Sequence, residues 1–291
     1  MNSVEIQKLS IPDRVLKEHL SFTLSKMKKG ELKKLWEKLD TKTFVINLKN
    51  RTDRAEKAKL NAENIGLDVE FYYAEKHKDG GVAGCFESHQ EICRMALKNN
   101  LSQIMILEDD FEGTAEIQTE TGVKALEEFI NFSISDSTWD VLYLGVVPNV
   151  WFEKTTRCGK YFYKMKPWCC THAMIISEKY MKEIVTWNFV GDGKDAYDWR
   201  HRKNDHAYSL HPQLFKQYES PSDIRNLQLP VPDVLRDVPN SFLSWYALNI
   251  NYSLIHGFCI FAIIAVLFSV SKSSSKQNET LAKTIFSRAM N

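Results

Sequence analysis

The stretch Ser102–Phe111, SQIMILEDDF, determines the fold of this chain. Four apolar residues, Ile104–Leu107, are followed at once by three carboxylates, Glu108, Asp109 and Asp110. A short apolar run bounded by polar residues predicts a buried strand, and in an open α/β sheet ligands bind beyond the carboxyl ends of the strands. Glu108 and Asp110 alternate along the chain, so they could bind one hard cation, Mg²⁺ or Mn²⁺. The alternative is a solvated acidic turn before the next helix.

Strands and helices alternate around this stretch. The predicted elements are strands at Thr43–Leu48, Val69–Glu75 and Asp140–Gly145 and helices at Gly84–Asn99 and Thr119–Phe132. This alternation predicts βαβ units and a parallel sheet. Two later runs, Lys160–Met165 and Cys170–Ile176, are also strand-like, and they predict a smaller subsheet in the second half of the chain.

Polar and basic residues follow the first predicted strand. Asn47 lies near its carboxyl end, and Arg51 and Arg54 come next, at the turn into a predicted helix. Guanidinium groups and helix N-terminal amides at such a turn suit a phosphate group. The alternative is that both arginines are solvated surface charges.

Composition excludes several classes of protein. A net charge of +1 over 291 residues carries no electrostatic footprint for nucleic acid, so no nucleic-acid partner is expected. The six cysteines lack paired CxxC spacing, which indicates neither a zinc site nor a disulfide framework. The first residues, MNSVEIQKLSIPDR, lack the apolar core of a signal peptide, and a reducing compartment is therefore expected for the main domain.

An apolar run near the carboxyl end, Tyr252–Val270, predicts a transmembrane helix. Its length is close to the roughly 20 residues that a membrane-spanning helix needs. Trp245 and Tyr246 flank the run, as interface aromatics do. The alternative is a buried terminal helix, although Gly257–Val270 shows no polar face.

Several motifs together identify a family resemblance. In chain order they are VINLKNRTDR (45–54), Ala74 before an acidic residue, GCFESHQEICRMAL (84–97), ILEDD (106–110), THAMIIS (171–177) and the string from Asp198 through HPQLFKQ (211–217) to Ser222–Ile224. In this order and spacing the chain resembles glycosyltransferase family 25, which includes lipopolysaccharide-type sugar transferases and collagen galactosyltransferases. Lys76 stands where the family often has a Gly, and Met174 where it often has an aromatic residue.

The resemblance implies a GT-A-like α/β fold, with a Rossmann-like mixed sheet, flanking helices, and a nucleotide-sugar half and an acceptor half in one domain. It implies transfer of a hexose, galactose or glucose, from a UDP-hexose to a hydroxyl of a glycan or protein, with inversion and with Mn²⁺ or Mg²⁺. Glu108 and Asp110 look like the metal-binding acids of the family. The residues expected to line the donor pocket are Asn47, Arg51, Arg54, Glu75, Ser88, His89, Glu108 and Asp109.

Inversion also needs a general base that deprotonates the acceptor hydroxyl. Asp198 matches the family pattern by its spacing to Pro212, and Asp195 is the second candidate. The alternative for either aspartate is an ion pair with Arg200 or Arg202.

The resemblance and the apolar run divide the chain into five segments. They are a helical lead-in (1–40), a glycosyltransferase domain (41–226), a proline-containing linker (227–244), a transmembrane helix (245–270) and a polar basic tail (271–291). A single-pass membrane protein with a cytosolic catalytic domain is expected, although the basic tail favours the opposite orientation. Two other functions remain open, namely a nucleotidyltransferase and a non-catalytic, membrane-tethered carbohydrate-binding protein.

Overall fold

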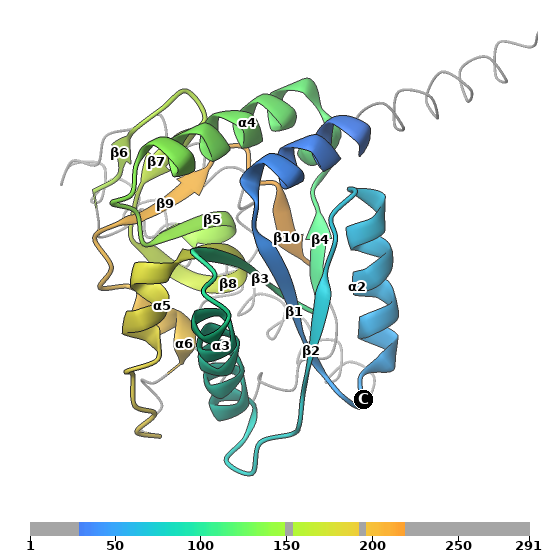
Figure 1. The fold of residues 1–291 in the computed structure, drawn as a ribbon, viewed down its shortest axis with the longest axis vertical. Helices are drawn as coiled ribbons and strands as arrows, with labels where there is room; N and C mark the ends of the chain where they lie inside the picture. Colours follow the sequence, from blue (N-terminus) through green and yellow to red (C-terminus); the bar gives the residue numbers. More distant parts are fainter. Residues whose placement is uncertain (1–28, 149–153, 192–195, 219–291) are drawn as a thin grey trace, which may run out of the picture.

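The computed structural model describes residues 29–148, 154–191 and 196–218, which form a mixed α/β fold around one large sheet (Figure 1). The large sheet has eight strands in the order β2-β1-β3-β8-β5-β9-β7-β6, and β4 and β10 form a separate pair. The strands are β1 (Lys42–Leu48), β2 (Glu70–Ala74), β3 (Gln103–Glu108), β4 (Phe111–Gly113), β5 (Val141–Pro148), β6 (Thr156–Arg157), β7 (Phe162–Lys164), β8 (Pro167–Ser177), β9 (Ala207–Leu210) and β10 (Phe215–Gln217).

Helices cover both faces of the large sheet (Figure 1). They are α2 (Thr52–Asn64), α3 (Gly81–Lys98), the short 3₁₀ helix η1 (Ala115–Gln118), α4 (Glu120–Ser135), α5 (Glu178–Ile184) and α6 (Tyr197–His201), besides a helix described over residues 29–39. The helix at 29–39, α2 and α4 share one apolar core with Met105 and Leu107 of β3. Helices α3, α5 and α6 share the other with Ile104 and Ile106. Adjacent residues of β3 therefore pack into the cores on opposite faces of the sheet, because side chains alternate across a strand.

The strand directions show at which end of the sheet a ligand would bind. Strands β1, β2 and β3 are mutually parallel, so their carboxyl ends lie together. Strand β8 runs antiparallel between β3 and β5. The sheet is thus mixed, as the family resemblance implied, and the parallel βαβ arrangement holds for the first three strands.

The expectation of a separate subsheet in the second half is wrong. Strands β7, β8 and β9 all belong to the eight-stranded sheet, because the long strand β8 pairs with β3 on one side and β5 on the other. The small separate sheet instead joins β10 to β4, directly after the acidic stretch. This pairing brings residues 215–217 beside residues 111–113.

Part of the predicted lead-in packs on the domain. In the helix at 29–39, Leu32, Trp36 and Leu39 are buried, and the Trp36 indole Nε1–H donates to the carbonyl oxygen of Ile65 at 3.1 Å. The predicted linker, transmembrane helix and basic tail lie outside the described residues. Within the part of the chain that the structure describes, the helices are too short or too polar to cross a membrane.

Candidate active site

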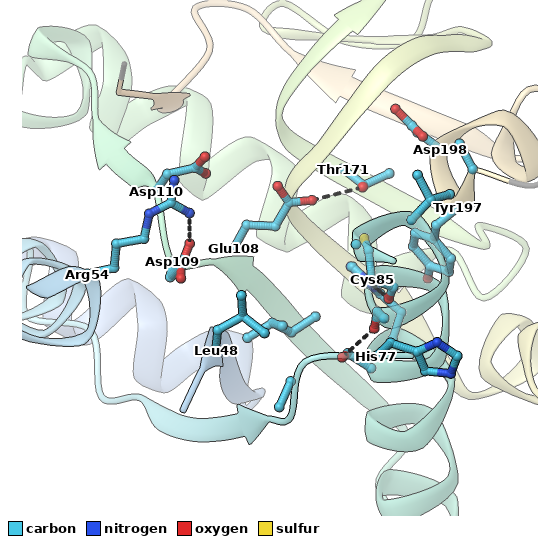
Figure 2. A pocket seen from close by; sticks show the side chains of 18 of the residues that line it. Leu48, Arg54, His77, Cys85, Glu108, Asp109, Asp110, Thr171, Tyr197 and Asp198 are labelled. Carbon is cyan, nitrogen blue, oxygen red and sulfur yellow. Dashed lines mark hydrogen bonds and ion pairs between the residues drawn. The ribbon is translucent and has the colours of Figure 1, made fainter. Parts of the chain in front are cut away.

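A pocket of about 410 Å³ lies at the carboxyl ends of the three parallel strands (Figure 2). Leu48 comes from the end of β1, Ala74 from the end of β2 and Glu108 from the end of β3. Opposite these strand ends, the first turns of α3 and the start of α6 complete the wall. Its volume is within the range of about 300–1,000 Å³ that is usual for small-molecule sites.

The three acids at the end of β3 point in two directions: Glu108 ends the strand, and Asp109 and Asp110 form the turn that follows it. Asp109 turns toward α2, where its carboxylate accepts a hydrogen bond of 2.6 Å from Arg54 (Figure 2). Glu108 turns toward β8, where its Oε1 accepts from the Thr171 hydroxyl at 3.2 Å. Asp110 shares with Glu108 a donor that sequence analysis did not single out, the Gln217 side chain.

Negative charge is concentrated in this pocket. Burial raises the pKa of the Glu108 carboxyl well above its usual range, and the carboxylates of Asp110 and Asp198 raise it further. Burial also raises the pKa of Asp109 to about 6, against the opposing effect of the Arg54 guanidinium. Neighbouring carboxylates disfavour each other's ionised form, and a cation bound between them would stabilise that form.

The donor set suits a hard divalent cation. Glu108 and Asp110 present carboxylate oxygens to one point, where the Gln217 Nε2 atom lies 3.0 Å from Glu108 Oε2 and 3.2 Å from Asp110 Oδ1. Carboxylate and carboxamide oxygens are the ligands that Mg²⁺ and Mn²⁺ prefer. Among the described residues, no group of three or more His, Cys, Asp or Glu side chains could hold a metal ion. The two acids would therefore need ligands of another kind to complete the coordination.

The residues after β1 are divided between the pocket and its surroundings. Arg54 lines the pocket and is buried against Asp109, so its charge supports the acidic loop. The Arg51 guanidinium lies beside the Asp53 carboxylate at 3.0 Å and does not line the pocket. The Asn47 side chain is buried in β1, donates to the Leu48 carbonyl at 2.7 Å and likewise lies outside the pocket lining.

The predicted donor residues of β2 and α3 do line the pocket. Glu75 lies at its rim, where the Lys49 ammonium contacts the Glu75 carboxylate at 2.5 Å. Ser88 donates to the Gly84 carbonyl at 2.6 Å. His89 donates through Nδ1 to the Cys85 carbonyl at 2.8 Å, and burial lowers the pKa of its imidazole to about 4. His89 is therefore a neutral part of the wall at pH 7 and adds no positive charge for a phosphate.

Asp198 lies on α6, across the pocket from the end of β3 (Figure 2). Its Oδ2 accepts from the Cys170 amide at 3.3 Å, and burial raises the pKa of its carboxyl. Arg200 donates to the Asn188 carbonyl at 2.7 Å. Arg202 lies 3.9 Å from the Trp199 ring centroid, and its charge lowers the pKa of Asp198 against the larger effect of burial. Asp195 lies outside the described residues.

Aromatic packing holds α6 against α3. The Tyr197 ring stacks on the His89 ring with centroids 3.9 Å apart, and His201 packs against Tyr197 at 4.6 Å and Trp187 at 5.5 Å. Both histidines are fully buried. Asp198 projects into the pocket from between Tyr197 and His201, so its position depends on this cluster.

Comparisons with known proteins give only distant similarities. No model of a known protein family and no curated protein matches the chain, so membership of glycosyltransferase family 25 stays a prediction. A solved structure titled as a glycosyltransferase involved in glycosylation of the major capsid of PBCV-1 is 15% identical, covers 63% of this chain and 94% of its own, and has a TM-score of 0.39. HddC from Yersinia pseudotuberculosis is 11% identical, covers 63% of this chain and 76% of its own, and has a TM-score of 0.34.

A third solved structure, apo UDP-glucose pyrophosphorylase, is 7% identical, covers 65% of this chain and 78% of its own, and has a TM-score of 0.34. All three similarities are weak, in sequence identity and in TM-score. The chemistry proposed for the pocket therefore rests on the residues of this chain.

Proposed function

We propose that the protein transfers a hexose, galactose or glucose, from a nucleotide sugar such as a UDP-hexose to a hydroxyl group of a glycan or protein acceptor, with inversion and with Mn²⁺ or Mg²⁺. The observation that carries this proposal is that one pocket holds two separate acidic groups. Glu108 and Asp110 extend from the end of β3, and Asp198 enters from α6 on the other side. One group suits the leaving diphosphate and the other suits the attacking hydroxyl.

Glu108 and Asp110 would hold the cation, which when bound neutralises the charge that develops on the leaving diphosphate. On the other side, the acceptor hydroxyl oxygen attacks the anomeric carbon while the bond from that carbon to the diphosphate oxygen breaks. The Asp198 carboxylate takes the hydroxyl proton. Burial raises the pKa of Asp198, which brings it nearer to the working pH of a general base.

The residues that line the pocket beside Asp198 favour sugar transfer over nucleotidyl transfer. A nucleotidyltransferase of this kind would bind a doubly negative sugar phosphate as its nucleophile. Among the described residues near Asp198 in the pocket lining are Cys170, Thr171 and Tyr197, none of them cationic. Two cationic side chains of the described lining lie elsewhere in the pocket: Arg54, which is held by the Asp109 carboxylate, and Lys76, which follows β2. A neutral hydroxyl acceptor suits this surface better than a phosphate does.

The first test measures product release from two substrate sets. The purified full chain is given Mn²⁺ and a panel of nucleotide sugars, or nucleoside triphosphates with sugar 1-phosphates. We expect release of nucleoside diphosphate from a nucleotide sugar, abolished in Asp110→Asn and kept in Asp53→Asn, because Asp53 is exposed and outside the pocket lining. Pyrophosphate release from the second set would identify a nucleotidyltransferase. Glycan binding with no release from either set would identify a non-catalytic protein.

A further inference from the structure

The Gln217 side chain lies where the two cation-binding carboxylates converge. Its Nε2 atom donates to Glu108 Oε2 at 3.0 Å and to Asp110 Oδ1 at 3.2 Å. One amide nitrogen thus contacts both acids at once, although about a hundred residues separate it from them in the chain. The Gln217 amide nitrogen therefore occupies the position between the two carboxylates at which a cation would bind.

The backbone holds Gln217 at this point. It ends β10, where it is paired with Phe111 of β4, the residue directly after the three acids. The next residue, Tyr218, donates its backbone N–H to the Asp110 carbonyl at 3.0 Å and its hydroxyl to the Asp109 carbonyl at 3.3 Å. The Gln217 backbone is therefore tied to the acidic loop on both sides, while the residue itself is exposed to solvent.

A carboxamide carries a donor nitrogen and an acceptor oxygen on the same carbon. Half a turn about the last side-chain torsion exchanges their positions, so Oε1 would replace Nε2 near Glu108 and Asp110. Glutamine oxygen is an accepted ligand of hard divalent cations. No three His, Cys, Asp or Glu side chains in the described part of the chain could hold a metal ion, so a third protein ligand from these residues would be of another type.

We propose that Gln217 is the third protein ligand of the cation: its side-chain amide lies between Glu108 and Asp110, and its oxygen would coordinate the cation when that is bound. This inference rests on the proposed function for the identity of the cation. A neutral carboxamide adds an oxygen donor without a further negative charge, in a pocket that already holds the carboxyl groups of Glu108, Asp110 and Asp198. The remaining coordination positions stay available to water and to the substrate diphosphate.

The test measures Mn²⁺ binding to the full chain, in detergent and without substrate, from the loss of the free Mn²⁺ electron paramagnetic resonance signal. We expect Gln217→Leu to weaken Mn²⁺ binding by at least about tenfold and Gln217→Glu to restore or tighten it, since a carboxylate also offers an oxygen. Lys216→Leu is the matched control: it is the neighbouring residue of β10, its ammonium contacts Glu112 at 3.3 Å, and it should bind Mn²⁺ as the wild type does.

Equal or tighter Mn²⁺ binding by Gln217→Leu would overturn the proposal, because the amide would then only compete for the site. Wild-type protein that binds no Mn²⁺ would also overturn it, and the release assay would then decide separately whether sugar transfer occurs without a metal. Should Gln217→Leu fail to fold, Gln217→Glu still decides: Mn²⁺ binding at least tenfold weaker than that of the wild type contradicts an oxygen ligand at this position.

Discussion

At the scale of single residues, the acids after β3 have separate tasks. All three acids line the pocket, but Glu108 and Asp110 share the Gln217 amide, whereas the Asp109 carboxylate accepts from Arg54. The Arg54–Asp109 pair is almost completely buried, with each side chain 10% exposed. The ion pair holds the acidic loop against α2, so Arg54 helps to position the acids of the site.

Arg54→Met should destabilise the protein by about 3–5 kcal/mol, since removing one partner of a buried ion pair leaves the other charge uncompensated. Arg51→Met is the matched control, because Arg51 lies beside the exposed Asp53, and such a pair is worth at most about 1 kcal/mol. Urea denaturation of both variants measures the free energy of unfolding. Equal losses in the two variants would contradict the structural role given to Arg54.

Asp198→Asn should reduce sugar transfer by about 10²–10⁴-fold, the usual contribution of a general base. Nucleotide and Mn²⁺ binding should stay nearly unchanged, because Asp198 lies across the pocket from Glu108 and Asp110. Transfer rates and nucleotide affinity are measured together, with Asp195→Asn as the comparison. If only Asp195→Asn lowers the rate, the base is Asp195. A product that retains the donor's anomeric configuration would contradict this mechanism for both.

At the scale of elements, α6 is positioned by aromatic side chains from its neighbours. It has only five residues, Tyr197–His201, too few to be stable alone. His201 packs against Tyr180 of α5 at 5.3 Å, and Tyr197 stacks on His89 of α3. Burial lowers the pKa of His201 to about 3 and that of His89 to about 4, so this cluster requires neutral imidazoles.

This requirement makes stability depend on pH. In the unfolded chain a histidine takes up a proton near pH 6.5, whereas folded His201 stays neutral until about pH 3. Between these values the unfolded state binds more protons, so stability is complete above pH 6.5 and falls as the pH is lowered. His201→Phe should reduce this slope by about 1.4 kcal/mol per pH unit, as measured by urea denaturation between pH 6.5 and 4.5.

Tyr180→Phe is the control for this prediction. It removes the hydroxyl that lies 3.3 Å from His201 Nδ1 and leaves the imidazole in place. The slope of stability with pH should therefore stay as in the wild type. If His201→Phe also leaves the slope unchanged, His201 is not neutral throughout this pH range in the folded protein.

At the scale of the whole molecule, the described fold accounts for residues 29–218 with two gaps, and the predicted membrane anchor follows it in the sequence. The described residues that line the pocket run from Ile46 to Tyr218, and all of them precede the predicted anchor in the sequence. A tether after the pocket would allow the domain to work next to a membrane surface without contributing to catalysis.

The full chain should stay with membranes after an alkaline carbonate wash, whereas a chain truncated after Pro239 should be released. The physical reason is the apolar run Tyr252–Val270, whose length is close to that of a membrane-spanning helix. Immunoblots of the pellet and the wash measure the partition. A full chain found mainly in the wash would show that the run does not span a bilayer.

The sequence by itself determined the elements of the first half and one end of the site. Apolar runs and their alternation predicted β1, β2, β3, α3 and α4 nearly at their observed positions, because each is a local pattern of burial. The carboxylates after Ile104–Leu107 marked the pocket, since a strand end in an α/β sheet faces ligands. Arg54, Ser88 and His89 lie in the pocket lining, and their role in binding the donor stays a prediction.

Only the tertiary structure decided which residues meet across the pocket. Thr171 reaches Glu108 because β8 runs antiparallel beside β3, and Gln217 reaches both acids because β10 pairs with β4. Asn47 and Arg51, which looked equivalent to Arg54 in the sequence, lie outside the pocket lining. Pairing between distant strands depends on the summed packing of the two cores, and no local run of residues carries that information.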